Sequence, residues 1–131
     1  MKMWQIATGL VVAILLLAAA ALWLYQAKGL YRFSPRAERP GDLGLTAMRV
    51  VEFTSEDGAS INLWLQDPAP GRPLIVSFYG NYAGIGPSAR RLLPLMEAGY
   101  GLAMMEYRGS GATKGPPGET RFAADARALY D

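Results

Sequence analysis

Two amino acids are missing from this chain of 131 residues: cysteine and histidine. Without cysteine the chain forms no disulfide and offers no thiolate nucleophile, which excludes disulfide-stapled scaffolds and cysteine-based hydrolysis. Without histidine it lacks the side chain that most often serves as general base near neutral pH. The carboxylates that remain as metal ligands are scattered, so we expect neither a metal site nor another cofactor.

Charged residues are scarce, at 18% of the chain, and they avoid its N-terminal part. From Trp4 to Tyr25 the sequence contains no Asp, Glu, Lys, Arg or Pro. As a helix this run is about 33 Å long, enough to cross a hydrocarbon layer of about 30 Å. Its aromatic ends, including Trp23, suit the membrane interface. We therefore predict a single-pass membrane protein, with residues 1–27 as the anchor and residues 4–25 in contact with lipid.

A cleaved signal peptide is the alternative for this segment. Lys2 precedes the apolar run, and small residues at positions 18–21 resemble a cleavage site. The apolar letters LWLY just beyond that site favour a retained anchor. The side of the membrane on which the rest of the chain lies stays open.

The positive charge of the chain is concentrated around the anchor. The first 39 residues carry five basic residues and one acidic residue, and the remainder carries eight basic and ten acidic residues. This distribution favours lipid headgroups as the partner of the basic flank and gives no indication of nucleic-acid binding.

The rest of the chain is expected to form an α/β fold. Residues 28–46, rich in Pro, Gly and Arg, are predicted to be a linker, and residues 47–131 a partial domain. The domain begins with two strands around an Asp57-Gly58 turn and continues with a buried strand at 74–78.

The pattern after residue 78 alternates between helix and strand. An apolar stripe predicts a helix at 88–98, which Pro94 should kink or split into two pieces. A second buried strand follows at 101–107, and a last helix at 119–131. A hairpin followed by strand, helix, strand and helix predicts a sheet with right-handed crossovers.

A glycine-rich segment after the strand at 74–78 allows two interpretations. Gly84, Gly86 and Ala89 spell G-x-G-x-x-A, and Glu106 lies 22 positions after Gly84. In a dinucleotide-binding module these glycines would approach a pyrophosphate and the acid would bind a ribose hydroxyl. Against this interpretation, residues 80–83 intervene between Tyr79 and the fingerprint, and Pro87 removes an amide.

Three segments, in this order and spacing, carry a resemblance to a known family. They read VVEFTSEDGASINLWLQDP, FYGNYAGIG and EYRGSGATKG. They resemble the N-terminal half of an α/β-hydrolase, most closely the membrane-anchored serine hydrolases called BEM46-like or ABHD13-like. The resemblance covers residues 48–131.

The resemblance implies an oxyanion loop at Gly80, Asn81 and Tyr82. In such a loop a backbone N–H stabilises the oxyanion formed after nucleophilic attack on a carbonyl, and one donor is typically worth about 10²–10³ in turnover. Gly80 is expected to allow a sharp reversal of the chain there. Tyr79 stands where the family usually has a histidine of structural role.

The resemblance also implies a loop beside the pocket after the second buried strand. Glu106 stands where the family usually has aspartate, and Tyr107, Arg108 and Gly109 match the family motif. For these three residues we expect a structural turn rather than a part in the reaction.

The family's catalytic triad has no counterpart in this sequence. No G-x-S-x-G motif is present, and Ser77, Ser88 and Ser110 lack both that context and an imidazole to take their proton. We expect a chain that is inactive alone, like the first half of a hydrolase acting on an ester, thioester or amide. The other alternative is a membrane-tethered half-domain that binds a partner strand at its open sheet edge.

Overall fold

The structure, a computed structural model, describes residues 2–131 except for the side chains of residues 27 and 28. The chain divides into two compact units, one that ends at Arg32 and one that comprises Phe33–Asp131. The predicted boundary between anchor and linker, at residue 27, falls inside the first unit.

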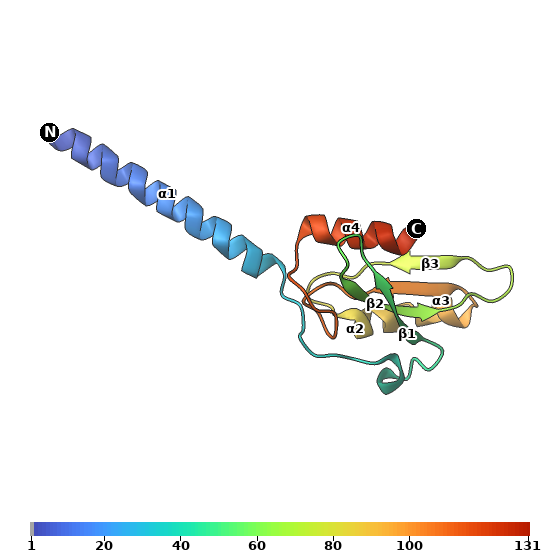
Figure 1. Cartoon of the computed structure of the whole chain (residues 1–131). Coiled ribbons are helices and arrows are strands. Elements are labelled where there is room, and N and C mark those ends of the chain that lie inside the picture. The colour runs from blue at the N-terminus through green and yellow to red at the C-terminus, as the bar shows by residue number, and fades with distance from the viewer. Residues whose placement is uncertain (1) are drawn as a thin grey trace. The chain divides into compact units, whose positions relative to one another are not determined.

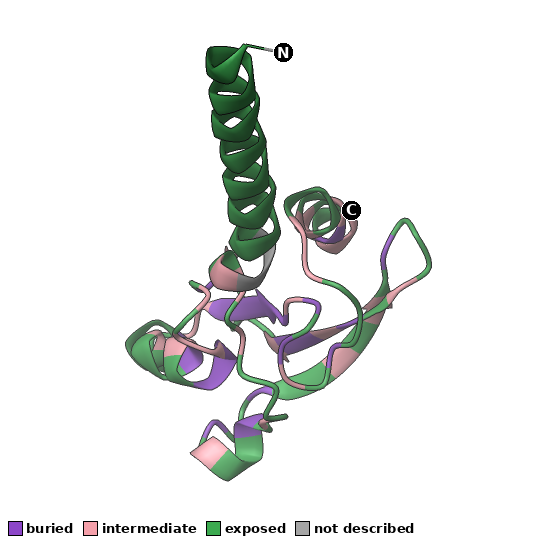
Figure 2. Ribbon diagram, turned by 90° about the vertical axis from the view of Figure 1, so that its left-hand side faces the viewer, coloured by how far each residue is buried: buried purple, intermediate pink, exposed green. Residues whose placement is uncertain are grey.

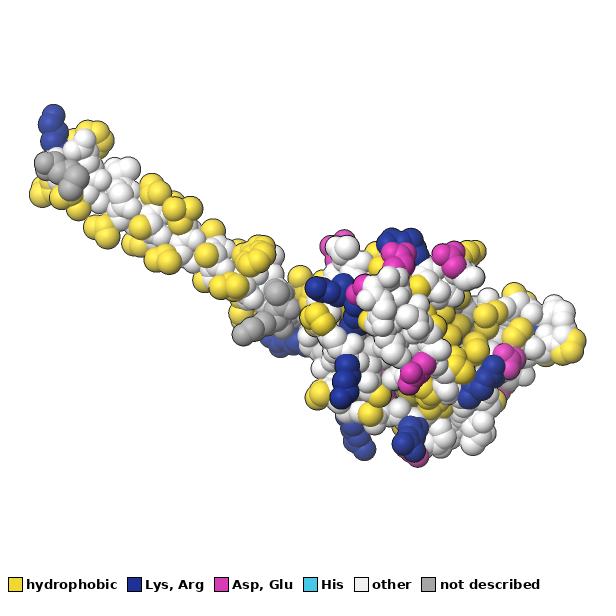
Figure 3. Space-filling model, viewed as in Figure 1, with side chains coloured by type: hydrophobic (Ala, Val, Ile, Leu, Met, Phe, Trp, Pro, Cys, Tyr) yellow, Lys and Arg dark blue, Asp and Glu magenta, His cyan; other side chains and the backbone are white. Residues whose placement is uncertain are grey.

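The first unit is essentially one helix, α1 (Met3–Leu30). Its segment Met3–Gln26 has 24 residues and a mean hydropathy of 2.5, which corresponds to a length of about 36 Å. Hydrophobic side chains lie along its visible face, and α1 is exposed in this membrane-free structure (Figures 2 and 3). The helix is thus long and apolar enough to cross a membrane, a property that signal sequences share.

The second unit is built on one four-stranded sheet with the order β1-β2-β4-β3 (Figure 1). An antiparallel hairpin is formed by β1 (Arg49–Thr54) and β2 (Ser60–Gln66). Next to β2 lies β4 (Gly101–Met105), antiparallel to it, and β4 pairs in parallel with β3 (Leu74–Ser77). The predicted α/β order, a hairpin followed by βαβα, is confirmed.

The predicted break in the first helix of this unit is present. The segment forms α2 (Ile85–Arg91) and α3 (Leu93–Glu97), because Pro94 has no N–H to continue the hydrogen-bond ladder. Beyond α3, Gly99 adopts a φ of 87°, the left-handed conformation that closes a helix C-terminus. The start of α2 lies three residues before the predicted start.

Helices cover both faces of the sheet. On one face lies α4 (Glu119–Tyr130), and on the other lie α2 and α3 (Figure 1). The core on the α2 and α3 side consists of Leu45, Met48, Trp64, Tyr79, Ile85, Ala89, Met96, Leu102 and Met104. Figure 2 shows that buried residues concentrate in the strands and in the helix segments facing them.

Most of the predicted linker is packed against the second unit. Residues 33–45, which we call the strap, include the short 3₁₀ helix Pro40–Leu43. Within the strap Leu45 is 3% exposed, and Leu43 packs against the core. The few apolar residues of the strap are not periodic, so the sequence carried no signal of this packing.

Gly101 provides a test of the packing at the start of β4. A Cβ placed on it would lie 2.7 Å from Pro68 Cδ and 2.8 Å from the Pro68 backbone nitrogen. Gly101→Ala should therefore lower the free energy of unfolding by about 1–3 kcal/mol, the usual cost of overpacking. Thermal unfolding of the detergent-solubilised chain, followed by tryptophan fluorescence, measures this. Gly41→Ala is the control, because nothing lies within 4 Å of its Cβ position.

Candidate functional site

The predicted oxyanion residues lie in a turn at the carboxyl end of β3. The turn spans Gly80 to Ala83 and is closed by the Ala83 N–H, which donates to the Gly80 carbonyl at 3.2 Å. The Tyr82 residue is 74% exposed. Because β3 and β4 are parallel, this turn and the loop after β4 meet at the same edge of the sheet, where open α/β sheets place their ligands.

The expectation that Gly80 allows the reversal is wrong. Gly80 does not have a positive φ, and nothing lies within 4 Å of a Cβ placed on it. The left-handed residue of this segment is Gly84, with a φ of 69°. A side chain at position 80 would therefore meet neither backbone strain nor a steric clash in this structure.

Tyr79, immediately before the turn, connects the loops that follow β3 and β4. Its hydroxyl donates to Ser110 Oγ at 3.3 Å and accepts from the Tyr107 N–H at 3.2 Å. The two tyrosine rings pack with their centroids 4.8 Å apart. Burial raises the pKa of the Tyr79 phenol to about 12, so its proton stays in place near neutral pH. The residue in the place of the family's histidine therefore acts as a structural link.

Glu106 organises the loop after β4. It is 2% exposed. Its Oε2 accepts from the N–H groups of Ala112 (3.1 Å) and Thr113 (2.9 Å), from the Thr113 hydroxyl (2.8 Å) and from the Asn62 amide (3.0 Å). A Cβ on Gly111 would lie within 2.7 Å of the Glu106 carboxyl carbon, so a glycine is required there. These contacts commit the carboxylate to the loop and disfavour a role as a ribose ligand.

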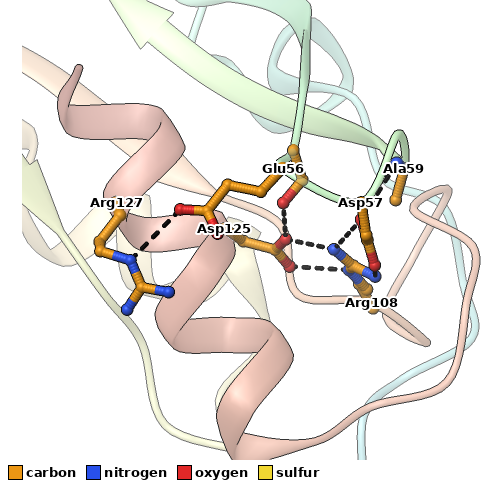
Figure 4. A network of polar contacts seen from close by, with 7 residues as sticks. Glu56, Asp57, Ala59, Arg108, Asp125 and Arg127 are labelled. Carbon is orange, nitrogen blue, oxygen red and sulfur yellow. Dashed lines mark hydrogen bonds and ion pairs between the residues drawn. The ribbon is translucent and has the colours of Figure 1, made fainter.

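Arg108 is buried between two carboxylates (Figure 4). It donates to both oxygens of Asp57, at 2.6 and 2.8 Å, and to both oxygens of Asp125, at 2.8 and 2.5 Å. Ser55 adds a hydroxyl donor to Asp125 at 2.5 Å. This network joins the hairpin turn, the loop after β4 and α4, so the expected structural role of Arg108 agrees with its contacts.

The network shifts the pKa values of Asp57 and Arg108 in the stabilising direction. Hydrogen bonds from Arg108 lower the pKa of Asp57 to about 2. The hydrogen bonds to Asp57 and then to Asp125 raise the pKa of Arg108.

The other two residues of the predicted pocket loop are structural as well. Tyr107 stacks on Phe33 of the strap, with centroids 5.4 Å apart, and contacts Phe122 of α4 at 4.9 Å. Gly109 has a φ of 82°, and its N–H donates to the Thr113 carbonyl at 3.0 Å. Together with Tyr79 these contacts make a rigid support beside the turn at 80–83.

The dinucleotide interpretation meets an obstacle at its own glycines. The Gly86 N–H, which would face a phosphate, donates to Glu38 Oε2 of the strap at 3.2 Å. A carboxylate of the chain thus lies where the anion would bind, and Pro87 offers no N–H. The geometry disfavours a phosphate at Gly84 and Gly86.

The serines show no arrangement for nucleophilic attack. Ser110 is 4% exposed and accepts the Tyr79 hydroxyl. Ser77 is the last residue of β3, and Ser88 lies within α2. Across residues 2–131 no group of three or more acidic side chains is placed to hold a metal ion.

Asp125 and Glu38 are among the residues of these networks that escaped the sequence analysis. Asp125 lies on the same face of the last helix as Phe122 and Leu129, and an acid within an apolar stripe is a signal of a buried ion pair that could have been noticed. Glu38 lies in a segment without periodicity, 48 positions before its partner, and no sequence pattern indicates that contact.

Solved structures with a similar fold include an esterase and a protein described as a hydrolase. The Pyrococcus furiosus esterase Pf2001 matches with a TM-score of 0.55 and 21% identity, over 75% of this chain and 40% of the esterase. A protein of Agrobacterium vitis S4, described as a candidate hydrolase, matches with a TM-score of 0.53 and 24% identity, over 64% of this chain and 36% of that protein. At these identities the similarity establishes the fold alone.

The chain spans about 40% of the length of the esterase that it matches. No protein-family profile matches the sequence. The second unit is therefore an α/β fold like part of a hydrolase domain.

The ion pair of Asp57 predicts how stability depends on pH. The folded-state pKa of about 2 lies below the value of about 3.9 expected in the unfolded chain. The stabilisation is therefore complete above about pH 4 and is lost as the pH falls towards 2. Asp57→Asn should flatten the fall in Tm between pH 4 and 2, measured by tryptophan fluorescence.

Asp42→Asn is the matched control, since Asp42 has no ion pair within the described part of the chain. Its Tm should follow the wild-type curve. An Asp57→Asn curve parallel to the wild-type curve over this range would contradict the assignment.

Proposed function

We propose that residues 33–131 are the N-terminal part of a serine hydrolase domain of the α/β type, similar to the membrane-anchored BEM46-like group. The backbone of Gly80, Asn81 and Tyr82 would stabilise the oxyanion formed from an ester, thioester or amide carbonyl. The nucleophilic serine, its acid and its histidine would come from polypeptide other than these 131 residues, because the chain has no histidine.

One observation carries this proposal: a tight turn follows β3, at the carboxyl edge of a parallel strand pair, in a fold that matches hydrolases. Backbone N–H groups in a fixed turn are the donors that acyl transfer needs, since they cost no reorganisation when the oxyanion develops. Tyr79 supports the turn from one side by its hydrogen bonds to the loop after β4.

The unpaired edge of β3 supports the proposal that further strands complete the domain. Among the described strands β3 pairs only with β4. Beside it lies an apolar groove of about 450 Å³, lined by Val76, Phe78, Ala126, Arg127, Tyr130 and Asp131. An apolar edge of this kind is an aggregation hazard unless another strand pairs with it. A separate partner strand would use the same edge, and a stoichiometric second chain after purification would favour that alternative.

In this proposal α1 is a retained membrane anchor in contact with lipid. Its length and apolar surface support insertion. The site would then act on substrates at or near a membrane.

The turn can be tested by deleting one N–H group. In a protein that combines this chain with the proposed serine, acid and histidine, Asn81→Pro should reduce the kcat for p-nitrophenyl butyrate by about 10²–10³ if the Asn81 N–H binds the oxyanion. Proline fits the second position of a β-turn, so the turn should persist. Asn81→Ala keeps the N–H and is the matched control, with a kcat close to wild type.

The 131-residue chain by itself should show no esterase turnover and no labelling by a fluorophosphonate probe, because it has neither a histidine to activate a serine nor a G-x-S-x-G motif. Turnover by this chain unaided would contradict the proposal. The proposal would also be contradicted if Asn81→Pro and Asn81→Ala had the same kcat and, in addition, Tyr82→Pro and Tyr82→Ala had the same kcat as each other.

The anchor can be tested by fractionation and mass. The expressed chain should stay in the membrane pellet after an alkaline carbonate wash and should retain its N-terminal residues by mass spectrometry. Leu15→Arg, which places a charge near the middle of the span at a cost of about 2.5–3.5 kcal/mol, should reduce the pelleted fraction. Leu15→Ile is the control. A soluble product cleaved near residues 18–21 would identify a signal peptide instead.

A further inference from the structure

The strap binds the helix that follows the candidate oxyanion turn. Glu38 of the strap accepts a hydrogen bond from the N–H of Gly86, the second residue of α2, at 3.2 Å. The two residues are 48 positions apart. The turn at 80–83 ends two residues before α2 begins, so whatever holds the start of α2 also limits the movement of the turn.

The start of α2 needs such a partner. The first N–H groups of a helix have no acceptor inside the helix, and a side chain just before the helix usually supplies one. Here the N-cap residue is Gly84, which makes no side-chain hydrogen bond. Glu38 supplies a remote acceptor, and its negative charge suits the positive end of the helix dipole.

Gly86 is fitted to this contact. A Cβ at position 86 would lie 2.5 Å from Glu38 Oε2 and 2.4 Å from Leu43 Cδ1. The glycine is therefore explained by the close approach of the strap, without any phosphate. Because the crowding atoms are the ends of flexible side chains, an alanine would displace them and leave the helix intact.

The strap also contacts α2 at its other end and the loop after β4. Arg90 Nε donates to the Leu43 carbonyl at 3.3 Å. The Gly111 N–H donates to the Ser34 carbonyl at 2.9 Å. The strap thus touches the structures on both sides of the candidate site.

We propose that Glu38 is a positioning residue: by accepting the Gly86 N–H it holds the start of α2 and fixes the turn Gly80–Ala83 against it. The strap is then a working part of the candidate site as well as the connection to α1. The consequence for catalysis rests on the proposed function, whereas the consequence for the turn does not.

Hydrogen exchange of the full chain in detergent tests the effect on the turn. Glu38→Ala should raise the exchange rate of the Ala83 N–H, which closes the turn, on the order of tenfold, the size expected for one hydrogen bond to a charged acceptor. Glu38→Gln keeps an oxygen acceptor and should retain most of the protection. Exchange of Ala103 in β4 should not change. Unchanged exchange at Ala83 in Glu38→Ala would overturn the proposal.

A double-mutant cycle tests whether Glu38 acts through Gly86. Gly86→Ala should expel the Glu38 carboxylate and raise Ala83 exchange to a similar extent. Combined with Glu38→Ala it should add only the effect of displacing Leu43, since both changes break the same contact between Glu38 and Gly86. Gly41→Ala, at an uncrowded glycine, is the control. Additive effects of the two changes would overturn the proposal.

Esterase kinetics of a protein that combines this chain with the proposed serine, acid and histidine test the catalytic consequence. Glu38→Ala should lower kcat about tenfold and leave KM nearly unchanged, because a displaced turn weakens transition-state binding more than substrate binding. Glu38→Gln should restore most of the kcat. An absence of esterase activity in the wild-type protein would refute the proposed function and leave the exchange experiment to decide on Glu38. Faster Ala83 exchange with unchanged kcat would refute the catalytic consequence.

Discussion

Arg108 lies buried between Asp57 and Asp125, and the tertiary arrangement of the second unit depends on this contact. The hairpin turn contributes Asp57 and Ser55, the loop after β4 contributes Arg108, and α4 contributes Asp125. A buried guanidinium is tolerated because its N–H groups find carboxylate oxygens, and removal of one partner from such a pair typically costs about 3–5 kcal/mol. Since α4 is a short amphipathic helix on one face of the sheet, the ion pair with Asp125 fixes its position more specifically than apolar contacts could.

Two further buried polar groups hold together the loops around the candidate site. The Tyr79 phenol and the Glu106 carboxylate are both buried, and each accepts N–H groups from the loop after β4. A phenol does not titrate near neutral pH, so the support of the turn does not vary with pH as an imidazole in its place could. The loops beside the turn are held by groups that are committed to structural hydrogen bonds, which is why our proposal assigns the function to the backbone of the turn.

Local patterns predicted the fold well. The Asp57-Gly58 turn, the apolar runs of β3 and β4 and Pro94 in the first turn of α3 each act through contacts of a few residues, and all were predicted from sequence. Contacts between distant residues were not. Glu38 with Gly86 and Arg108 with Asp125 join segments 48 and 17 positions apart, and no periodicity reports such pairs. Gly86 shows the difficulty most clearly. From the sequence alone, a glycine at this position is equally consistent with a phosphate-binding loop and with close packing of the strap.

The peptide that connects α1 to the sheet has two parts, the residues before Phe33 and the strap, and proteolysis would affect them differently. A protease that cuts before Phe33 would detach the apolar helix and leave every strap contact in place, so the released fragment would keep its native arrangement. A cut at Gly44 would separate Glu38 and Leu43 from the rest of the second unit and free the neighbouring core residue, Leu45, to move into water. Release of the second unit with every strap contact retained therefore requires a cut before Phe33.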